Sequence, residues 1–219
     1  MAGTITALVA QKKNKDRVNV YLDGQFAFGL AAIEAIRLKR GQVLSDADIA
    51  RLTQADDIEK AHEKALRFLG NRPRSEWEVR QNLTKAGFEA GTIDRVIERL
   101  KGVALIDDAA FVKYWLENRA QFNPRGQVAL RQELRRKGVE RDVIDAVLGE
   151  LDHDDEQAAV RSALAKADRY RQLPRDEFAQ KLGAYLARRG FNYETVRVAV
   201  AEAWRAVHAD DNPIDEIEE

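Results

Sequence analysis

Three stretches of the 219-residue chain share one pattern: Leu83-Thr-Lys-Ala-Gly-Phe88, Leu134-Arg-Arg-Lys-Gly-Val139 and Leu186-Ala-Arg-Arg-Gly-Phe191. Consecutive glycines are 51 and 52 residues apart, which is typical of helical repeat units of about 40 to 50 residues. Each glycine is expected to end a helix in the left-handed conformation that only glycine adopts without strain, and the next apolar side chain packs back over the last turn. We therefore interpret Gly87, Gly138 and Gly190 as structural repeat residues.

Amphipathic helices are predicted on both sides of each glycine. Apolar residues recur at helical spacing after it, and further helical stretches precede each pair at 57–69, 107–120 and 154–170. The fold class is therefore predicted to be mainly α, with tandem repeats of three-helix units that form an elongated curved array. The expected repeats are 57–104, 105–152 and 153–209.

Residues 1–56 are predicted to form an N-terminal β-hairpin region with linking helices. Val18, Val20 and Leu22 alternate with polar neighbours, as in a half-buried strand. Asp23-Gly24 favours a type I′ turn, so residues 25–30 return as the partner strand and residues 4–11 add a third. Such a small antiparallel sheet needs to dock on something else to be stable.

Polar residues at the predicted helix starts indicate N-terminal caps. Ser45 with Asp48 starts one helix, and Ser75 with Glu78 fits a capping box. Asn192 fits another N-cap. The pair Asp107-Asp108 is better explained by capping than by metal binding, because adjacent side chains at a helix start point apart and carboxylates complement the helix dipole.

Composition excludes several classes of protein. The chain has no cysteine, so it has no disulfide framework or thiolate zinc site, and a reducing cytoplasm is the expected location. Its apolar runs are far shorter than the roughly 20 residues that span a bilayer, so no membrane partner is expected. It lacks the motifs of nucleotide-binding loops, dinucleotide folds, serine hydrolases and zinc proteases. We expect a monomer that is not an enzyme and has no cofactor or metal.

Charge is unevenly distributed although the net charge is −1. The segment 119–141 is strongly basic, whereas residues 210–219 carry six carboxylates and are expected to form an acidic mobile tail. Cations at the C-terminal end of a helix in this basic segment would complement the helix dipole. The same cations could instead bind phosphate groups or an acidic partner.

The aromatic side chains of Trp77, Trp115 and Trp204 are interpreted as packing residues rather than base-stacking platforms.

The order of these motifs resembles RecX, the family of bacterial regulators of the RecA recombinase. The resemblance covers about residues 58–200. It is carried by Arg72-Pro-Arg-Ser-Glu-Trp-Glu-Val79 with Leu83 and Gly87, Leu105-Ile-Asp-Asp108 with Phe111, Gly126 through Leu130, Glu133-Leu134 and Lys137-Gly138-Val139. Trp77 and Val79 depart from the pattern, since a smaller residue and a leucine are expected there.

The resemblance implies a protein that binds the RecA filament in its helical groove. It would block filament extension or promote disassembly, and inhibit recombinase, ATPase and coprotease activities. The likeness also favours a partner-binding or DNA-binding role for the basic residues. The candidates are Arg72, Arg74, Arg125, Arg131, Arg135, Arg136, Lys137, Arg188 and Arg189.

A direct DNA-binding helical repeat module is the alternative hypothesis, because two helices joined by a glycine turn also describe a helix-turn-helix. A helix that reads the major groove would carry its positive charge on the second helix of each pair. Here the strongest cluster lies on the first helix, so sequence-specific reading is disfavoured, and weak binding to single-stranded DNA stays open.

Overall fold

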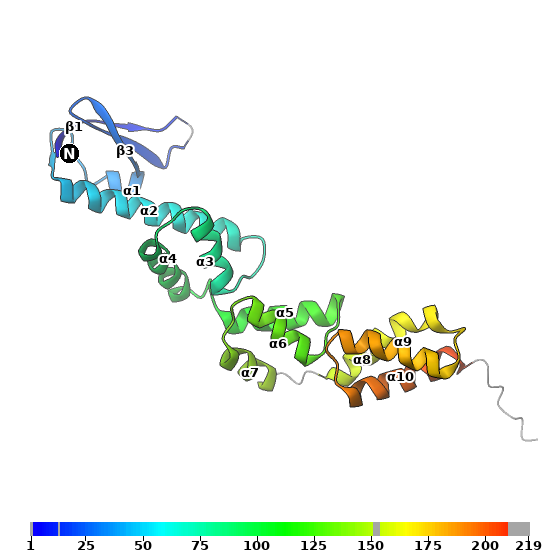
Figure 1. The fold of residues 1–219 in the computed structure, drawn as a ribbon. Coiled ribbons are helices and arrows are strands. Elements are labelled where there is room, and N and C mark those ends of the chain that lie inside the picture. Colours follow the sequence, from blue (N-terminus) through cyan, green and yellow to red (C-terminus); the bar gives the residue numbers. More distant parts are fainter. Residues whose placement is uncertain (1, 13, 151–153, 210–219) are drawn as a thin grey trace, which may run out of the picture. The chain divides into compact units, whose positions relative to one another are not determined.

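The computed structural model describes residues 2–12, 14–150 and 154–209, and the predicted acidic tail at 210–219 lies outside them. The chain divides into two compact units, residues 1–106 and 107–219 (Figure 1). The first unit holds the sheet and the first helical repeat. The second holds the other two repeats.

The predicted N-terminal sheet is confirmed and gains one short strand. It consists of β1 (Gly3–Ala10), β2 (Arg17–Leu22), β3 (Gln25–Ala31) and β4 (Val43–Leu44) in the antiparallel order β3-β2-β1-β4. Asp23 and Gly24 connect β2 to β3 with φ of 49° and 86°, which is the backbone of a type I′ turn.

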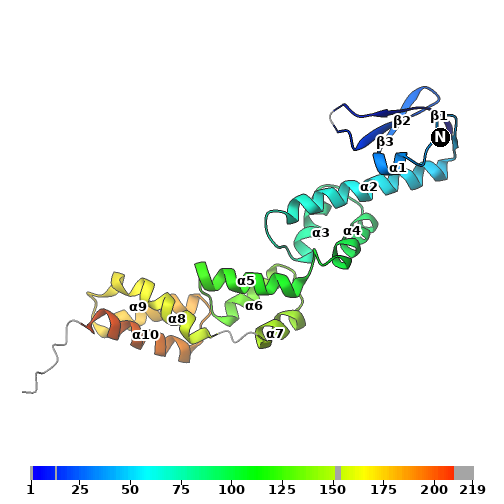
Figure 2. The same cartoon turned by 180° about the vertical axis from the view of Figure 1, so that it is seen from behind.

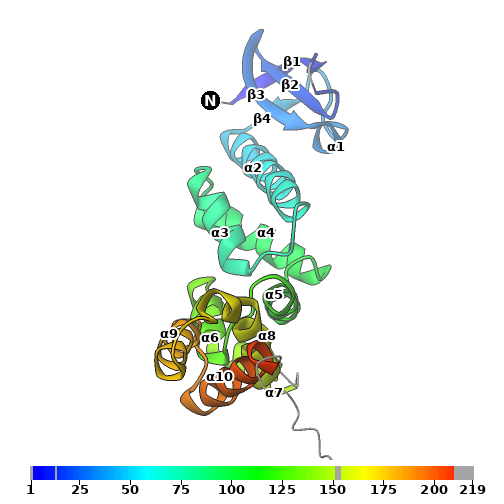
Figure 3. The same ribbon diagram turned by 90° about the vertical axis from the view of Figure 1, so that its right-hand side faces the viewer.

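The sheet docks on the first half of a long helix, α2 (Asp46–Leu69), with the short helix α1 (Ala32–Ala35) beside it (Figure 3). Leu52 of α2 completes a buried core with Ile5, Val20, Leu22, Leu30, Ala35 and Leu44. Inside this contact Asp56, which is 1% exposed, binds Arg17 at 2.8 Å and Lys60 at 2.7 Å. One helix therefore supports the sheet by both apolar and ionic contacts.

The same helix α2 continues into the first repeat (Figure 2). It runs without a break through residues 56 and 57, where the predicted N-terminal region ends and the predicted first repeat begins. Its second half packs on α3 (Glu76–Lys85) and α4 (Ala90–Gly102). Ala61 and Ala65 of α2 join Val79, Leu83 and the apolar face of α4 in one core. The first unit is thus built along a single helix.

The second unit contains two further three-helix groups. One consists of α5 (Asp108–Phe122), α6 (Gln127–Arg136) and α7 (Arg141–Glu150). The other consists of α8 (Asp155–Ala167), the 3₁₀ turn η1 (Asp168–Tyr170), α9 (Arg175–Arg188) and α10 (Tyr193–Val207), with α10 packed on both α8 and α9. Each group has its own buried apolar cluster.

The turn between the last two helices is the same in all three groups. Gly87, Gly138 and Gly190 have φ of 86°, 77° and 84°. In the first, Phe88 N–H donates to Leu83 O at 3.3 Å and Gly87 N–H donates to Thr84 O at 3.0 Å, the hydrogen-bond pattern of a Schellman motif. The glycine spacing in the sequence reflects this repeated helix ending.

Side-chain caps start the helices that the sequence marked. Ser45 and Asp48 form a reciprocal capping box, and Asn192 accepts a hydrogen bond from Thr195 N–H. Asp107 accepts from two backbone N–H groups at the start of α5. The packing prediction is wrong for Trp77, which is 44% exposed, because the buried stripe of α3 runs through Glu78, Val79 and Leu83 and leaves Trp77 outside it.

Candidate partner-binding surface

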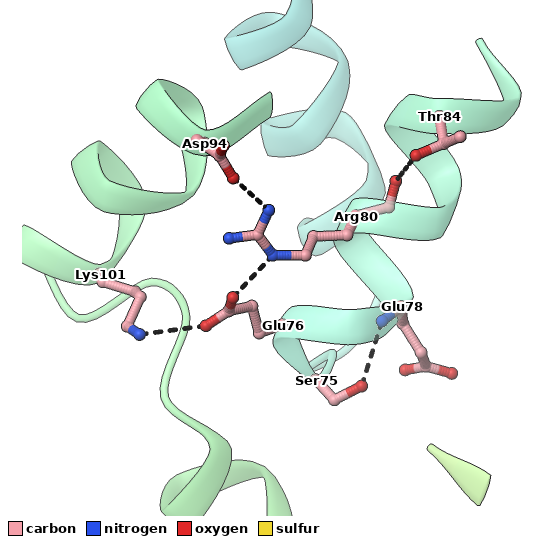
Figure 4. A network of polar contacts seen from close by, with 7 residues as sticks. All are labelled: Ser75, Glu76, Glu78, Arg80, Thr84, Asp94 and Lys101. Atoms are coloured by element: carbon pink, nitrogen blue, oxygen red, sulfur yellow. Dashed lines mark hydrogen bonds and ion pairs between the residues drawn. The ribbon is translucent and has the colours of Figure 1, made fainter. Parts of the chain in front are cut away.

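A charged network joins α3 to α4 in the first repeat (Figure 4). Arg80 donates from Nε to Glu76 Oε1 at 2.7 Å and from Nη1 to Asp94 Oδ1 at 2.6 Å. Lys101 Nζ binds the other oxygen of Glu76 at 3.0 Å. Burial alone would raise the pKa of Glu76, but the hydrogen bonds from Arg80 and Lys101 outweigh it and hold that pKa below its ordinary value. We call Glu76, Arg80 and Asp94 the polar frame of the first repeat.

The second repeat has the same frame 51 residues later, made by Gln127, Arg131 and Asp145. Arg131 donates from Nη1 to Gln127 Oε1 at 2.9 Å and from Nε to Asp145 Oδ1 at 3.0 Å. Arg141 Nε adds a bond to Asp145 Oδ2 at 3.3 Å. Hydrogen bonds from Arg131 and Arg141 lower the pKa of the Asp145 carboxyl. Arg131 is therefore engaged between α6 and α7, rather than directed wholly to solvent.

Arg125 and Lys137, two more predicted binding residues of the second repeat, contact other side chains of the same repeat. Glu133 accepts from Arg119 Nε at 2.7 Å and from Trp115 Nε1 at 3.0 Å, and Arg125 Nε lies 3.6 Å from its other oxygen. Lys137 Nζ lies 5.2 Å from the centroid of the Trp115 ring. These contacts hold the cations against α5 and α6.

The predicted cations of the first repeat lie at the entry to α3. Arg72 donates to both carboxylate oxygens of Glu78, at 3.1 and 2.9 Å. The guanidinium of Arg74 stacks 4.0 Å from the centroid of Phe68. Ser75 accepts from Glu78 N–H as predicted. Both arginines thereby brace the loop that leads into α3.

Arg189 lies in the seam between the second and third repeats. Its guanidinium donates to Pro124 O at 2.9 Å and to Asn123 Oδ1 at 2.7 Å, and its own carbonyl accepts from Gly126 N–H at 3.0 Å. Asp155 at the start of α8 accepts from Gln127 N–H at 3.1 Å. The start of α6 is therefore fixed by the third repeat, a role for Gly126 that the sequence reasoning missed.

Three predicted residues are exposed and form no ion pair within the described part of the chain: Arg135, Arg136 and Arg188. Arg135 and Arg136 are neighbours on the last turn of α6. Arg135 also lines a cavity of about 290 Å³ together with Arg131 and Arg141. The structure thus brings the predicted residues Arg131 and Arg135 of α6 to one cavity with Arg141 of α7.

Sequence reasoning missed Arg141 and the repeated frame as site features. The signal was present, because Arg80 and Asp94 recur as Arg131 and Asp145 at the same 51-residue offset that relates the first two glycines.

Across the described ranges, no cluster of histidine, cysteine or carboxylate side chains is arranged to hold a metal ion. Within those same ranges, no helix has the length and hydrophobicity to cross a membrane.

These features define a tandem three-helix repeat protein with a small N-terminal sheet. Family models for the regulatory protein RecX match four consecutive segments: the N-terminal domain at 3–45 and the first, second and third three-helix domains at 61–100, 107–148 and 154–200. The chain belongs to the RecX family of regulatory proteins.

Individual relatives agree with this assignment. The regulatory protein RecX of Bacillus licheniformis is 31% identical over 201 residues, covering 90% of this chain and 76% of the relative. That of Geobacillus kaustophilus is 32% identical over 210 residues, covering 91% and 77%. A crystal structure of regulatory protein RecX is similar with a TM-score of 0.71 and 29% identity, over 93% of this chain and 99% of that one. The RecX structure from Lactobacillus salivarius, at 23% identity and a TM-score of 0.61, is similar in fold and covers 68% of this chain and 97% of its own.

Proposed function

We propose that this chain binds the RecA filament on DNA in its helical groove and inhibits filament extension, with consequent loss of recombinase, ATPase and coprotease activity. The observation that supports this best is the run of four RecX family segments from residue 3 to residue 200. The protein acts in the cytoplasm and regulates DNA repair and recombination through its partner.

The exposed cations of α6 are the proposed contact of the second repeat with the filament. Arg135 and Arg136 are exposed, and Arg135 lines a cavity with Arg131 and Arg141. Clustered cations attract an acidic protein surface or the phosphates of filament DNA. The other predicted cations act mainly within the fold, because Arg72, Arg125 and Arg189 have intramolecular partners.

Direct DNA binding is the second candidate function, favoured by the same two exposed arginines. A major-groove reader would present cations on α7, the second helix of the pair. Arg141 on α7 pairs instead with Asp145 at 3.3 Å. We propose that any DNA contact is weak, independent of base sequence and made to phosphates.

Titration of RecA ATP turnover on single-stranded DNA tests the proposed function. The full chain should lower turnover at substoichiometric ratios to RecA. The double variant Arg135→Ala/Arg136→Ala should need about fivefold more protein, as expected for loss of about 1 kcal/mol of exposed-charge contacts. Its far-UV circular dichroism should match wild type, because surface substitutions usually change stability by about 0.5 kcal/mol or less.

The matched control is Arg161→Ala/Arg205→Ala, which removes the same charge from exposed positions of α8 and α10. It should inhibit as wild type does. Undiminished ATP turnover at excess wild-type chain would refute the proposed function. Equal potency of wild type and the Arg135→Ala/Arg136→Ala variant would refute the role of these two arginines and leave the proposed function standing.

A further inference from the structure

The third repeat lacks the polar frame that the first two share. The equivalents of Gln127, Arg131 and Asp145 lie 52 residues further on, at Ala179, Gly183 and Arg197. Ala179 and Gly183 have no side-chain group that can form a hydrogen bond, and Arg197 stands where the other repeats have an aspartate. The ion pair that links the last two helices in the other repeats therefore has no counterpart between α9 and α10.

A groove of about 530 Å³ lies at this place between α9 and α10. All three changed positions line it, together with apolar residues of both helices and of the turn between them: Phe178, Ala184, Ala187, Phe191, Val196, Val200, Ala201 and Trp204. By contrast, the frame residues Arg131 and Asp145 line the cavity at the equivalent place in the second repeat. The loss of the frame thus coincides with an open apolar surface.

Two further positions change in the same direction. Lys101, which binds Glu76 in the first repeat, corresponds to Trp204 in the third. Trp204 packs edge-on against Phe178 with ring centroids 5.1 Å apart and lines the groove. Arg141 of the second repeat corresponds to Tyr193, which is 83% exposed at the groove. Each of these two positions therefore carries a cation in one other repeat and an aromatic side chain in the third.

The charges at the groove indicate what would bind there. Among the residues that the structure describes, Arg175 and Arg197 are the charged ones that line it, and no carboxylate does. An apolar surface with two cations is complementary to apolar side chains accompanied by one or two carboxylates, because the apolar part is removed from water and each charge finds a partner. A nucleic acid backbone would leave the apolar lining without a partner.

We propose that the α9–α10 groove binds a peptide segment of the RecA filament that presents apolar side chains flanked by one or two carboxylates. This rests on the proposed function, and it adds a second docking site to the cations of α6. The chain's own residues 210–219 are a poorer match, since they carry six carboxylates and the groove offers two arginines and an apolar lining. Unpaired charges placed against apolar surface carry a large desolvation cost.

The double variant Gly183→Arg/Arg197→Asp tests the groove by restoring the arginine and aspartate of the frame. Gly183 lies within α9, and among the described residues a Cβ there would meet only Val196 Cγ1, at 3.6 Å, which is ordinary contact. Replacement of a mid-helix glycine also favours the helix. The variant is therefore expected to fold, with an arginine across the groove and a carboxylate in place of the cation of Arg197.

Sedimentation with RecA filaments on single-stranded DNA is the measurement. The double variant should bind at least tenfold more weakly than wild type. The control Arg205→Gln changes the net charge by the same −1 on α10 outside the groove and should bind within twofold of wild type. Equal binding by wild type and the double variant would overturn the groove proposal while the proposed function stands. Absence of binding by wild type would overturn both.

Site-specific cross-linking tests the occupant without filling the groove. The chain has no cysteine, so Ala184→Cys in the groove and Ala165→Cys on the exposed face of α8 each give one site for benzophenone maleimide. With filaments present, the label at 184 should cross-link to RecA at least tenfold more than the label at 165. Equal yields, or cross-links from 184 to residues 210–219 of the same chain, would overturn the proposal.

Discussion

Gly126→Ala should destabilise the second unit by about 3 kcal/mol, because overpacking and the loss of a buried hydrogen bond combine at the seam between the repeats. A Cβ at Gly126 would overlap the carbonyl of Gly190 and lie 2.6 Å from Phe191 N. The backbone there is not the cause, since Gly126 has φ of −73° and ψ of 157°, which alanine adopts readily. The expected loss comes from the close approach of two backbones.

Urea unfolding of the full chain, followed by far-UV circular dichroism, measures this effect. The control is Gly149→Ala, since a Cβ at Gly149 meets no atom of the described residues within 4 Å. Gly149 lies in α7, so its change should be neutral or stabilising by up to about 1 kcal/mol. If the two variants unfold at the same urea concentration, the Gly126–Gly190 seam does not hold the second and third repeats together in solution.

Asp56→Asn should cost about 3 kcal/mol, because breaking a buried ion pair leaves its partner without a counter-charge. Asp56 is 1% exposed and the side chain of its partner Arg17 is 14% exposed. Lys60 retains Asp57 at 3.1 Å, so the loss falls mainly on Arg17 and on the contact of the sheet with α2. Amide exchange of β2 and β3 should therefore accelerate.

The neighbouring change Asp57→Asn is the matched control for this prediction. It removes an ion pair to the same Lys60, but the Asp57 side chain is 46% exposed. Exposed pairs contribute about 0 to 1 kcal/mol, so urea unfolding of this variant should stay close to wild type. Equal destabilisation by the two substitutions would mean that burial of Asp56 does not anchor the sheet.

The repeat architecture could be predicted from the sequence because its signals are local. A glycine that ends a helix with positive φ needs only its own backbone, and the capping serine, asparagine and aspartate act within a few residues. The Asp23-Gly24 turn specified the hairpin in the same way. The strand β4 was missed because two residues, Val43 and Leu44, carry no periodicity of their own.

The candidate surface was harder to predict because a cation's exposure depends on its neighbours across the fold. Arg189 follows the same helix-end pattern as Lys137, yet it binds Asn123, which lies 66 residues away in sequence. Trp77 was interpreted as a packing residue, although the buried stripe of its helix leaves it 44% exposed. The change at the groove of the third repeat could have been found in the sequence, since Gly183 and Arg197 interrupt a pattern that the first two repeats share.

Sedimentation of the full chain with RecA filaments on single-stranded DNA, across a salt series, tests the central claim most directly. Phosphate contacts weaken steeply with salt, so binding of the chain to bare DNA should disappear as salt rises. At a salt concentration where bare DNA retains none of the chain, the proposed regulator should still sediment with the filament. Loss of filament binding in parallel with loss of DNA binding would contradict it and favour a direct DNA-binding repeat module.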